Sequence, residues 1–270
     1  MLQNKIKISC IIPTCDRPEY LKQALDSIFK QTYKPGEIIV VNNGKESLDL
    51  KDERYKNIKV YNIIPYVGVS QARNFGASLA SGDYLAFLDD DDLWSENYLE
   101  NTLKAIESGA QCILSRIDYL DKDKVSLAKN PHRRLSVENL YTFNPGVIGS
   151  NIVVSKNIFI QVGGFDTKLV TSEDKSLIIE ILKRKIKIAT LPDSQVLWRV
   201  HQIERLTDSD KLAEGIYLFN QKYRQSMKKW QYFYNLSKVY RHKLRIGEKR
   251  FIIHFFFVKL LFYFFKSIQI

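Results

Sequence analysis

The chain is poor in cysteine. Only Cys10, Cys15 and Cys112 occur in 270 residues, and no two of them form a Cys-x-x-Cys motif. Three cysteines without a pairing pattern exclude the disulfide framework of a small secreted domain. We therefore expect a protein of the reducing cytosol.

Long apolar runs are missing as well. The first residues, MLQNKIKISCIIPT, hold a short apolar run before Pro13 and no small-residue cleavage site, so no signal peptide is expected. The most apolar stretch, residues 251–265, is interrupted by His254 and Lys259 and is shorter than the ~20 residues that a membrane span needs. A transmembrane helix is therefore not expected.

Acidic residues are almost absent from the end of the chain. Residues 222–270 contain twelve Lys or Arg and a single acid, Glu248, whereas residues 1–221 contain 29 bases and 29 acids. The net charge of +11 therefore belongs to the tail. This length suits one domain plus an appendage, and we divide the chain into a neutral domain at 1–207 and a basic helical region at 208–270.

One acidic stretch dominates the neutral part. In GDYLAFLDDDDLW, residues 82–94, an apolar strand at 84–88 runs into four consecutive aspartates, Asp89 to Asp92. Such a strand is typical of a parallel sheet covered on both faces, where ligands bind beyond the carboxyl ends of the strands. Adjacent carboxylates repel one another, and a Mg²⁺-type ion that shares its shell with a phosphate would relieve the repulsion. A solvated acidic loop is the alternative.

Strands and helices alternate along the first part of the chain. Strands are expected at 5–14, 37–41, 57–63 and 84–88, and helices at 18–28, 69–79 and from about residue 95. The alternation predicts right-handed βαβ units and an α/β fold with a mostly parallel central sheet flanked by helices.

The pattern loosens after Cys112. Residues 111–128 indicate a hairpin or the edge of a second sheet, and residues 130–150 a loop-rich segment near a site. The later expectations are a strand at 151–155, a short helix at 155–162, a turn at 163–164, a helix at 171–185, strands at 185–191 and 195–201, and helices past residue 208.

Three blocks of sequence resemble family 2 glycosyltransferases of the GT-A, Rossmann-like fold. The blocks are IIPTCDRPEYLKQALDSIFKQTYKPGEIIVVNNG, GVSQARNFGASLASGDYLAFLDDDDLW and VGGFDTKLVTSEDKSLIIEILKR. They follow the order and spacing of the family over residues 5–202. The resemblance implies a nucleotide-sugar donor, a divalent metal and an acceptor site.

For the donor, the resemblance places Pro13, Thr14 and Asp16 against the base and ribose, where an ordinary turn is the alternative. Asn42 stands where the family more often has an aspartate, and its carbonyl can still accept a hydrogen bond from a pyrimidine N–H. A plain Asn-Asn-Gly turn is the alternative there. Arg73 is implied at the nucleotide side of the pocket, since its guanidinium offers a fixed fork of donors, with a surface salt bridge as the alternative.

For the metal, the family's Asp-x-Asp maps onto Asp89-x-Asp91. Asp89 is then implied near the ribose, Asp90 in the donor site and Asp91 on a Mn²⁺ or Mg²⁺ ion that neutralises the diphosphate leaving group. A register of Asp90-x-Asp92 stays open. His201 is implied as a residue that reaches back to the metal or diphosphate, and an imidazole suits Mn²⁺ better than Mg²⁺. A histidine on a strand edge is the alternative.

For the acceptor, the resemblance implies a site around Gly164 and the Glu173-Asp174 pair, with Asp174 as the catalytic base. The alternative is structural, because Thr171-x-x-Asp174 fits a capping box and acids are favoured in a first helical turn.

The tail combines bases with an aromatic-rich apolar stretch. As a helix, residues 251–265 would place Lys259 and Lys266 on one face and a broad aromatic face opposite. This pattern suits a helix that lies in the membrane interface, on anionic headgroups. Packing on the protein's own core or in a homodimer is the alternative.

The interpretation is a metal-dependent, inverting glycosyltransferase, cytoplasmic and peripheral on the inner face of the cell membrane. It would transfer a sugar from a nucleotide-diphosphate donor to a saccharide or lipid-linked saccharide, in cell-surface polysaccharide or lipid-linked glycan synthesis. One rival is a non-catalytic nucleotide- or glycan-binding protein of the same fold. A nucleic-acid binder, suggested by the basic Tyr-rich tail, is disfavoured by the neutral first domain with its acidic site.

Overall fold

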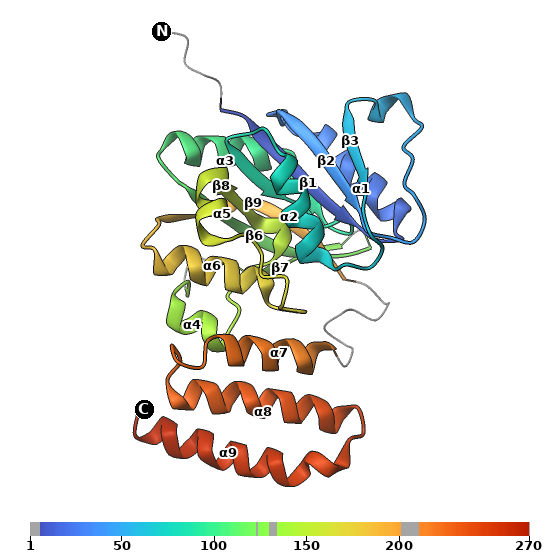
Figure 1. The fold of residues 1–270 in the computed structure, drawn as a ribbon. Coiled ribbons are helices and arrows are strands. Elements are labelled where there is room, and N and C mark those ends of the chain that lie inside the picture. Colours follow the sequence, from blue (N-terminus) through green and yellow to red (C-terminus); the bar gives the residue numbers. More distant parts are fainter. Residues whose placement is uncertain (1–5, 123, 130–133, 201–210, 270) are drawn as a thin grey trace.

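The computed structural model describes residues 6–122, 124–129, 134–200 and 211–269. Within them a nine-stranded sheet has the order β3-β2-β1-β4-β8-β6-β9-β5, with β7 paired to β6 (Figure 1). Its first four strands are β1 (Ile8–Thr14), β2 (Glu37–Asn42), β3 (Ile58–Asn62) and β4 (Tyr84–Phe87). All four run parallel, as the alternation predicts.

Helices cover both faces of this parallel half. α1 (Pro18–Phe29) and α3 (Tyr98–Glu107) pack in one hydrophobic cluster with the sheet. α2 (Val69–Leu79), α5 (Lys156–Val162) and α6 (Glu173–Lys183) belong to the cluster on the other face. Every residue of β1 and β2 is buried, which explains their nearly unbroken apolar runs. The small packing face of α2 is confirmed at Gly76, where a Cβ would lie 2.6 Å from Ile11.

The other half of the sheet is mixed rather than parallel. β8 (Ile152–Ser155) is antiparallel to β4 and to β6 (Cys112–Asp121), whereas β9 (Ile188–Arg199) is parallel to β6. β5 (Leu93–Trp94) is antiparallel to β9. The expected hairpin is confirmed, since β7 (Lys124–Lys129) folds back on β6 within the same sheet. The two strands expected at 185–201 are one strand whose register shifts opposite Ser115 and Arg116.

The expected helices past residue 208 are present as α7 (Lys211–Lys222), α8 (Lys229–Arg245) and α9 (Ile252–Ser267). They lie below the sheet as successive layers, with short α4 (Val137–Thr142) beside them (Figure 1). Phe219, Tyr223 and Met227 belong to the same hydrophobic cluster as the sheet. The helical region is therefore packed onto the domain from α7 onwards.

Candidate functional site

The acidic run occupies the turn between β4 and β5, and its side chains alternate in exposure. The side chains of Asp89 and Asp91 are 26% and 19% exposed. Asp90 and Asp92 are buried. The two outward carboxylates have the spacing of Asp89-x-Asp91, and this arrangement favours that register over Asp90-x-Asp92.

The two buried aspartates hold neighbouring segments together. The Thr14 hydroxyl donates to Asp90 at 2.7 Å, and the Ser150 hydroxyl donates to Asp92 at 2.5 Å. Burial raises the pKa of Asp90 to about 7, although Arg17 and Thr14 favour its charged form. Burial also holds the pKa of Asp92 well above its ordinary value. These carboxyls therefore fix the loop that carries the outward pair.

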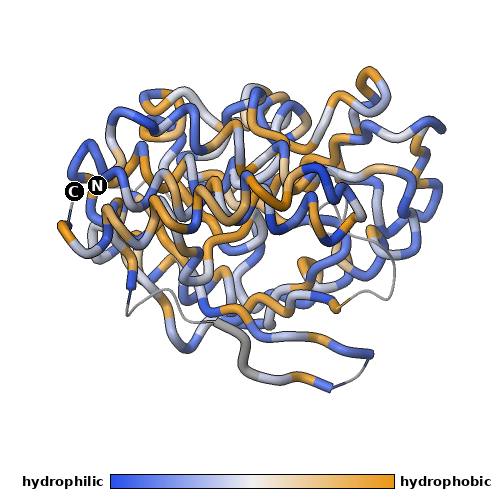
Figure 2. Tube along the Cα trace, turned by 90° about the horizontal axis from the view of Figure 1, so that it is seen from below, coloured by the Kyte–Doolittle hydropathy of each residue, from blue (hydrophilic) through white to orange (hydrophobic). Residues whose placement is uncertain are grey.

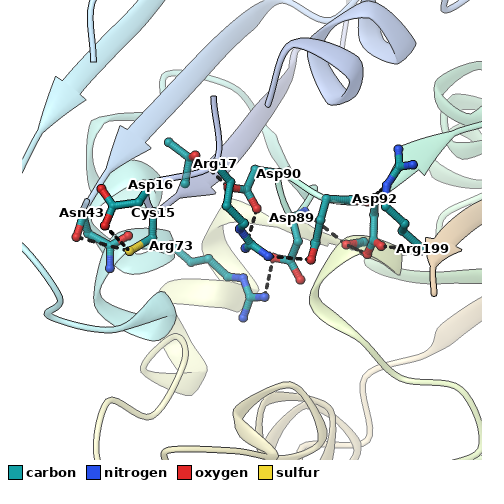
Figure 3. Close-up of polar contacts among 12 residues, drawn as sticks. Cys15, Asp16, Arg17, Asn43, Arg73, Asp89, Asp90, Asp92 and Arg199 are labelled. Atoms are coloured by element: carbon teal, nitrogen blue, oxygen red, sulfur yellow. Dashed lines mark hydrogen bonds and ion pairs between the residues drawn. The ribbon is translucent and has the colours of Figure 1, made fainter. Parts of the chain in front are cut away.

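Arginines supply the positive charge that four adjacent carboxylates require. The Arg17 guanidinium lies 2.5 Å from Asp90 and 2.7 Å from Asp91, and the Arg199 Nε donates to the Asp91 carbonyl at 3.0 Å (Figure 3). Neither arginine was predicted as a site residue. The signal for Arg17 was present, because the loop after β1 and the loop after β4 leave adjacent parallel strands at the same edge of the sheet.

Arg73 lies at the centre of the site and is buried, with 3% of its side chain exposed. It reaches Asp89 Oδ1 at 2.6 Å and Glu173 Oε1 at 2.9 Å, so its ion pairs are internal rather than on the surface. The guanidinium also lies 5.0 Å from the centre of the Phe165 ring. Arg73 thus joins Asp89, an outward acid of the acidic run, to the start of α6.

Two further residues shape the surroundings of this arginine and were not predicted, one beside its guanidinium and one that holds the Phe165 backbone. A Cβ on Gly149 would lie 2.2 Å from an Arg73 nitrogen, so only glycine leaves room for the guanidinium. Asn74 donates to the Phe165 carbonyl at 2.8 Å and accepts from the Phe165 N–H at 2.9 Å. This pair of hydrogen bonds holds the turn at Gly164, whose φ of +69° favours glycine.

Asp174 lies in the first turn of α6, beside Glu173. The capping box of the structural alternative is wrong, because Ser172 is the N-cap, with φ of 69° and no side-chain hydrogen bond to the helix. The other part of that alternative holds, since both acids lie in the first turn. The Asp174 carboxylate instead accepts from the Lys175 N–H at 2.6 Å. Burial, and then the charge of Glu173, raise the pKa of Asp174 to about 7. A carboxyl that titrates near neutrality is suited to general-base chemistry.

The loop residues expected near the base have mostly internal partners. Asn42 donates to the Glu46 carbonyl and to Asn62, both at 2.8 Å, and accepts from the Gly44 N–H, which is the bonding expected of the turn alternative. Asp16, at φ of 54°, accepts from the Lys45 N–H at 2.8 Å and from the Tyr66 hydroxyl at 2.9 Å. Pro13 is buried within β1, next to Thr14.

The carboxylate oxygens at this site are suitable ligands for a hard cation. Among the residues that the structure describes, no group of three or more His, Cys, Asp or Glu is placed to hold a metal ion. Mg²⁺ usually takes only one or two carboxylates and completes its shell with water and substrate phosphates, so Asp91 with a diphosphate fits. His201, the other expected ligand, lies outside the described residues.

The family model for glycosyl transferase family 2 matches residues 9–163, which is more than half of the chain. The protein belongs to glycosyl transferase family 2. Its chain is 29% identical over 256 residues to the glycosyltransferase GlyA of Streptococcus pneumoniae, covering 90% of this chain and 31% of that protein. It is 39% identical over 105 residues to YwdF of Bacillus subtilis, an uncharacterized glycosyltransferase, covering 38% of this chain and 39% of that one.

Solved structures of TarS from S. aureus share the GT-A fold of this chain. TarS 1–349 in complex with UDP-GlcNAc superimposes with a TM-score of 0.67 at 16% identity, covering 91% of this chain and 75% of that one. A likeness at this identity shows the fold alone. The chain spans only 31% and 58% of the length of two of its curated relatives, from S. pneumoniae and Rickettsia typhi.

Proposed function

We propose that this family 2 glycosyltransferase moves a sugar from a nucleotide-diphosphate donor to a saccharide hydroxyl, with inversion and with help from a divalent metal. The observation that carries the proposal is the Arg73 bridge, which holds Asp89 and Glu173 so that the outward carboxylates and Asp174 belong to one site. The TarS complexes with UDP-GlcNAc and UDP support a nucleotide-sugar donor.

In the proposed reaction Asp174 accepts the proton of the acceptor hydroxyl while the hydroxyl oxygen attacks the anomeric carbon. The bond between that carbon and the diphosphate breaks on the opposite face, and the nucleoside diphosphate leaves with the electron pair. One displacement inverts the configuration and needs no covalent intermediate. Glu173 and Gly164 lie on the acceptor side of this arrangement.

The proposed metal, Mn²⁺ or Mg²⁺, would be held by Asp91 and His201. When bound it would neutralise the charge that grows on the diphosphate. Asp89, Asp90, Arg73 and the loop of Pro13, Thr14 and Asp16 would border the donor. Because the side chains of Thr14 and Asn42 have internal partners, we assign them to shaping the loop and its backbone rather than to reading the base.

A panel of nucleotide sugars tests this proposal. Melting temperature is measured with each sugar in the presence of Mn²⁺, Mg²⁺ or excess chelator, and release of nucleoside diphosphate is then measured with the stabilising donor. We expect one donor to raise the melting temperature only with metal, and Asp91→Ala to abolish both the rise and turnover. Full turnover in chelator contradicts metal dependence. Donor binding without any turnover would favour the non-catalytic alternative.

We also propose that the protein lies peripherally on the inner face of the membrane, through α9. No helix among the described residues is both long and apolar enough to cross a bilayer. One face of α9 nevertheless remains uncovered, with large side chains that are 46–76% exposed: Ile252, Ile253, Phe256, Phe257, Leu260, Tyr263, Phe264 and Ile268. Figure 2, seen from below, shows this side of the molecule.

Charge complementarity favours an anionic membrane over a second copy of the chain. Five bases gather around the turn between α8 and α9: Arg241, Lys243, Arg245, Lys249 and Arg250. Each base near an anionic surface contributes on the order of 1 kcal/mol. A symmetric dimer in which the two turns meet would bring like charges together, whereas anionic headgroups would neutralise them. A lipid-linked saccharide on that membrane is the acceptor that we propose.

Substitutions on the uncovered face test membrane binding more sharply than removal of α9, which would expose the aromatic residues of α8. The variant Ile253→Ser/Phe257→Ser/Leu260→Ser is compared with Ile64→Ser/Ile160→Ser, which changes exposed apolar residues elsewhere. We expect only the first variant to lose sedimentation with vesicles of phosphatidylglycerol and phosphatidylcholine, at unchanged melting temperature. Absence of vesicle binding by the unmodified chain would support the packing alternative. So would an unmodified chain that is dimeric and a first variant that is monomeric.

A further inference from the structure

We infer that the acceptor hydroxyl belongs to a sugar chain that extends well away from the membrane, and not to the lipid's own phosphate or its first sugar. This inference rests on the proposed docking of α9 and on the way in which the C-terminal helices are stacked. Each layer of the stack is fixed to the next layer or to the domain by specific contacts, so the height of Asp174 above a membrane under α9 is set by the fold.

The first layer, α9, is fixed to α8 by an aromatic seam. Phe265 stacks on Phe233 with ring centres 5.3 Å apart, and Phe251 stacks on Tyr240 at 5.6 Å. Phe262 packs between Trp230 and Tyr234, and Val258 is buried between the helices. The packed face and the uncovered face lie on opposite sides of α9, so a membrane on the uncovered face lies beyond α8 as seen from the sheet.

The second layer, α8, is fixed to the domain through buried amides. Asn235 is buried and donates to the Tyr141 carbonyl in α4 at 2.8 Å. Gln231 is also buried and donates to the Glu138 carbonyl at 2.8 Å. Buried polar groups bonded in this way resist sliding, because a displaced amide would leave its hydrogen bonds unmade.

The third layer, α7, is locked against the helix that carries Asp174. Its Lys222 amine lies 2.7 Å from Asp166 and 2.8 Å from the Ser176 hydroxyl, and Tyr223 bonds Ser176 at 2.8 Å. Gly215 lies against Thr171, where a Cβ would approach the threonine oxygen to 2.0 Å. The order from the membrane is therefore α9, α8, α7 and α6, as Figure 1 shows from the side.

Three helix-to-helix steps separate α9 from α6. At about 8–10 Å per step, Asp174 stands roughly 25–30 Å above the axis of α9. An interfacial helix itself lies within the headgroup layer, which is only about 5–8 Å deep on each side of the hydrocarbon. A lipid phosphate or the first sugar on it stays in or near that layer and does not reach Asp174. A chain of several sugars does.

Fluorescence energy transfer to the vesicle surface tests the height. A dye is attached at Thr167→Cys, in the exposed loop before α6, or at Lys249→Cys, at the start of the α9 segment, in a Cys15→Ser background whose other cysteines are buried. With vesicles of phosphatidylglycerol and phosphatidylcholine that contain an acceptor dye, we expect strong transfer from position 249 and at least several-fold weaker transfer from position 167. Equal transfer from both positions would overturn the inference while leaving membrane docking intact.

Acceptor length provides the second test. Vesicles carry a polyprenyl phosphate, a polyprenyl-linked monosaccharide or a polyprenyl-linked oligosaccharide, and release of nucleoside diphosphate from the stabilising donor is measured. We expect at least tenfold faster release with the oligosaccharide than with the two short acceptors. Efficient use of the polyprenyl phosphate would overturn the inference alone. Failure of the full chain to sediment with vesicles would overturn the docking proposal, and this inference with it.

Discussion

Arg73 and Glu173 lie one hundred residues apart in the chain and meet at 2.9 Å. The same guanidinium holds Asp89 at 2.6 Å, so one buried cation sets the position of an acid on the proposed donor side and of the residue beside the proposed base. Removing one member of a buried ion pair leaves an uncompensated charge, which is far more costly than loss of a surface pair. The bridge therefore predicts effects on both sides of the site.

The first prediction concerns the space around this bridge. Gly149→Ala places a methyl group 2.2 Å from an Arg73 nitrogen, and the backbone of the tight segment around Ser150 cannot move away freely. We expect a loss of about 1–3 kcal/mol in the free energy of unfolding, as for other overpacked interiors, together with weaker donor binding. Denaturant titration and donor-induced shifts in melting temperature measure the two effects. A fully stable, fully active variant would show that Arg73 has room to move.

The second prediction concerns the pH dependence of turnover. The charged groups around Asp174 are Glu173, which raises its pKa, and Lys175 and Arg73, which lower it. Glu173→Gln removes the neighbouring negative charge, so the pKa of Asp174 should fall and the acidic limb of the pH–rate profile should move to lower pH. Glu180→Gln is the matched control, because Glu180 lies on the same helix but faces Tyr223. An unmoved limb would remove Asp174 from the role of base.

Much of the parallel half of the fold could be predicted because its elements are determined locally. The apolar runs at β1 and β2 and the small residues on α2 carry their own periodicity, and those elements end within a few residues of the expected positions. The mixed half could not be predicted in the same way. Whether β6 pairs with β8 and β9 depends on contacts between residues far apart in the chain, about which local periodicity says nothing.

The same difference between local patterns and contacts of distant residues applies to the candidate site. The acidic run and the Glu173-Asp174 pair are contiguous and could be recognised from the sequence. The partners of Asp90 are not, because Thr14 and Arg17 meet it only after β1 pairs with β4. At Asn42 the residue type was compatible with either a contact to the base or a turn. Only its hydrogen bonds to Glu46 and Asn62, which the sequence does not reveal, distinguish these two roles.

The third prediction compares two neighbours in the acidic run. Asp92→Ala leaves the buried Ser150 hydroxyl and the Arg199 N–H without their acceptor, and we expect a loss of about 1–3 kcal/mol in the free energy of unfolding. Asp91→Ala gives up a partly exposed pair with Arg17, which contributes about 0–1 kcal/mol. Only Asp91→Ala should abolish stabilisation by donor plus Mn²⁺ while the melting temperature of the free protein stays nearly unchanged. The reverse pattern would point to the register Asp90-x-Asp92.

The last prediction separates catalysis from stability at Asp174. Its pKa is raised in the folded protein, so the native state binds this proton more tightly than the unfolded chain does. The stabilisation of the native state by this bound proton is complete below the ordinary aspartate pKa of about 4. It is lost as the pH rises through the folded-state pKa of about 7. Asp174→Asn cannot ionise, so its melting temperature relative to the unmodified protein should be higher at pH 8 than at pH 5.

The same variant should lose transfer by roughly 10²–10⁴-fold at pH 8 while it still binds the donor, since a positioned base contributes about that much. The two measurements are made on one preparation, so a misfolded protein is recognised by its low melting temperature at both pH values. If Asp174 only stabilised the start of α6, the substitution would cost stability and leave the rate per folded molecule intact. A variant whose melting temperature rises relative to the unmodified protein at pH 8, and which binds the donor without turnover, supports Asp174 as the base and contradicts the purely structural alternative.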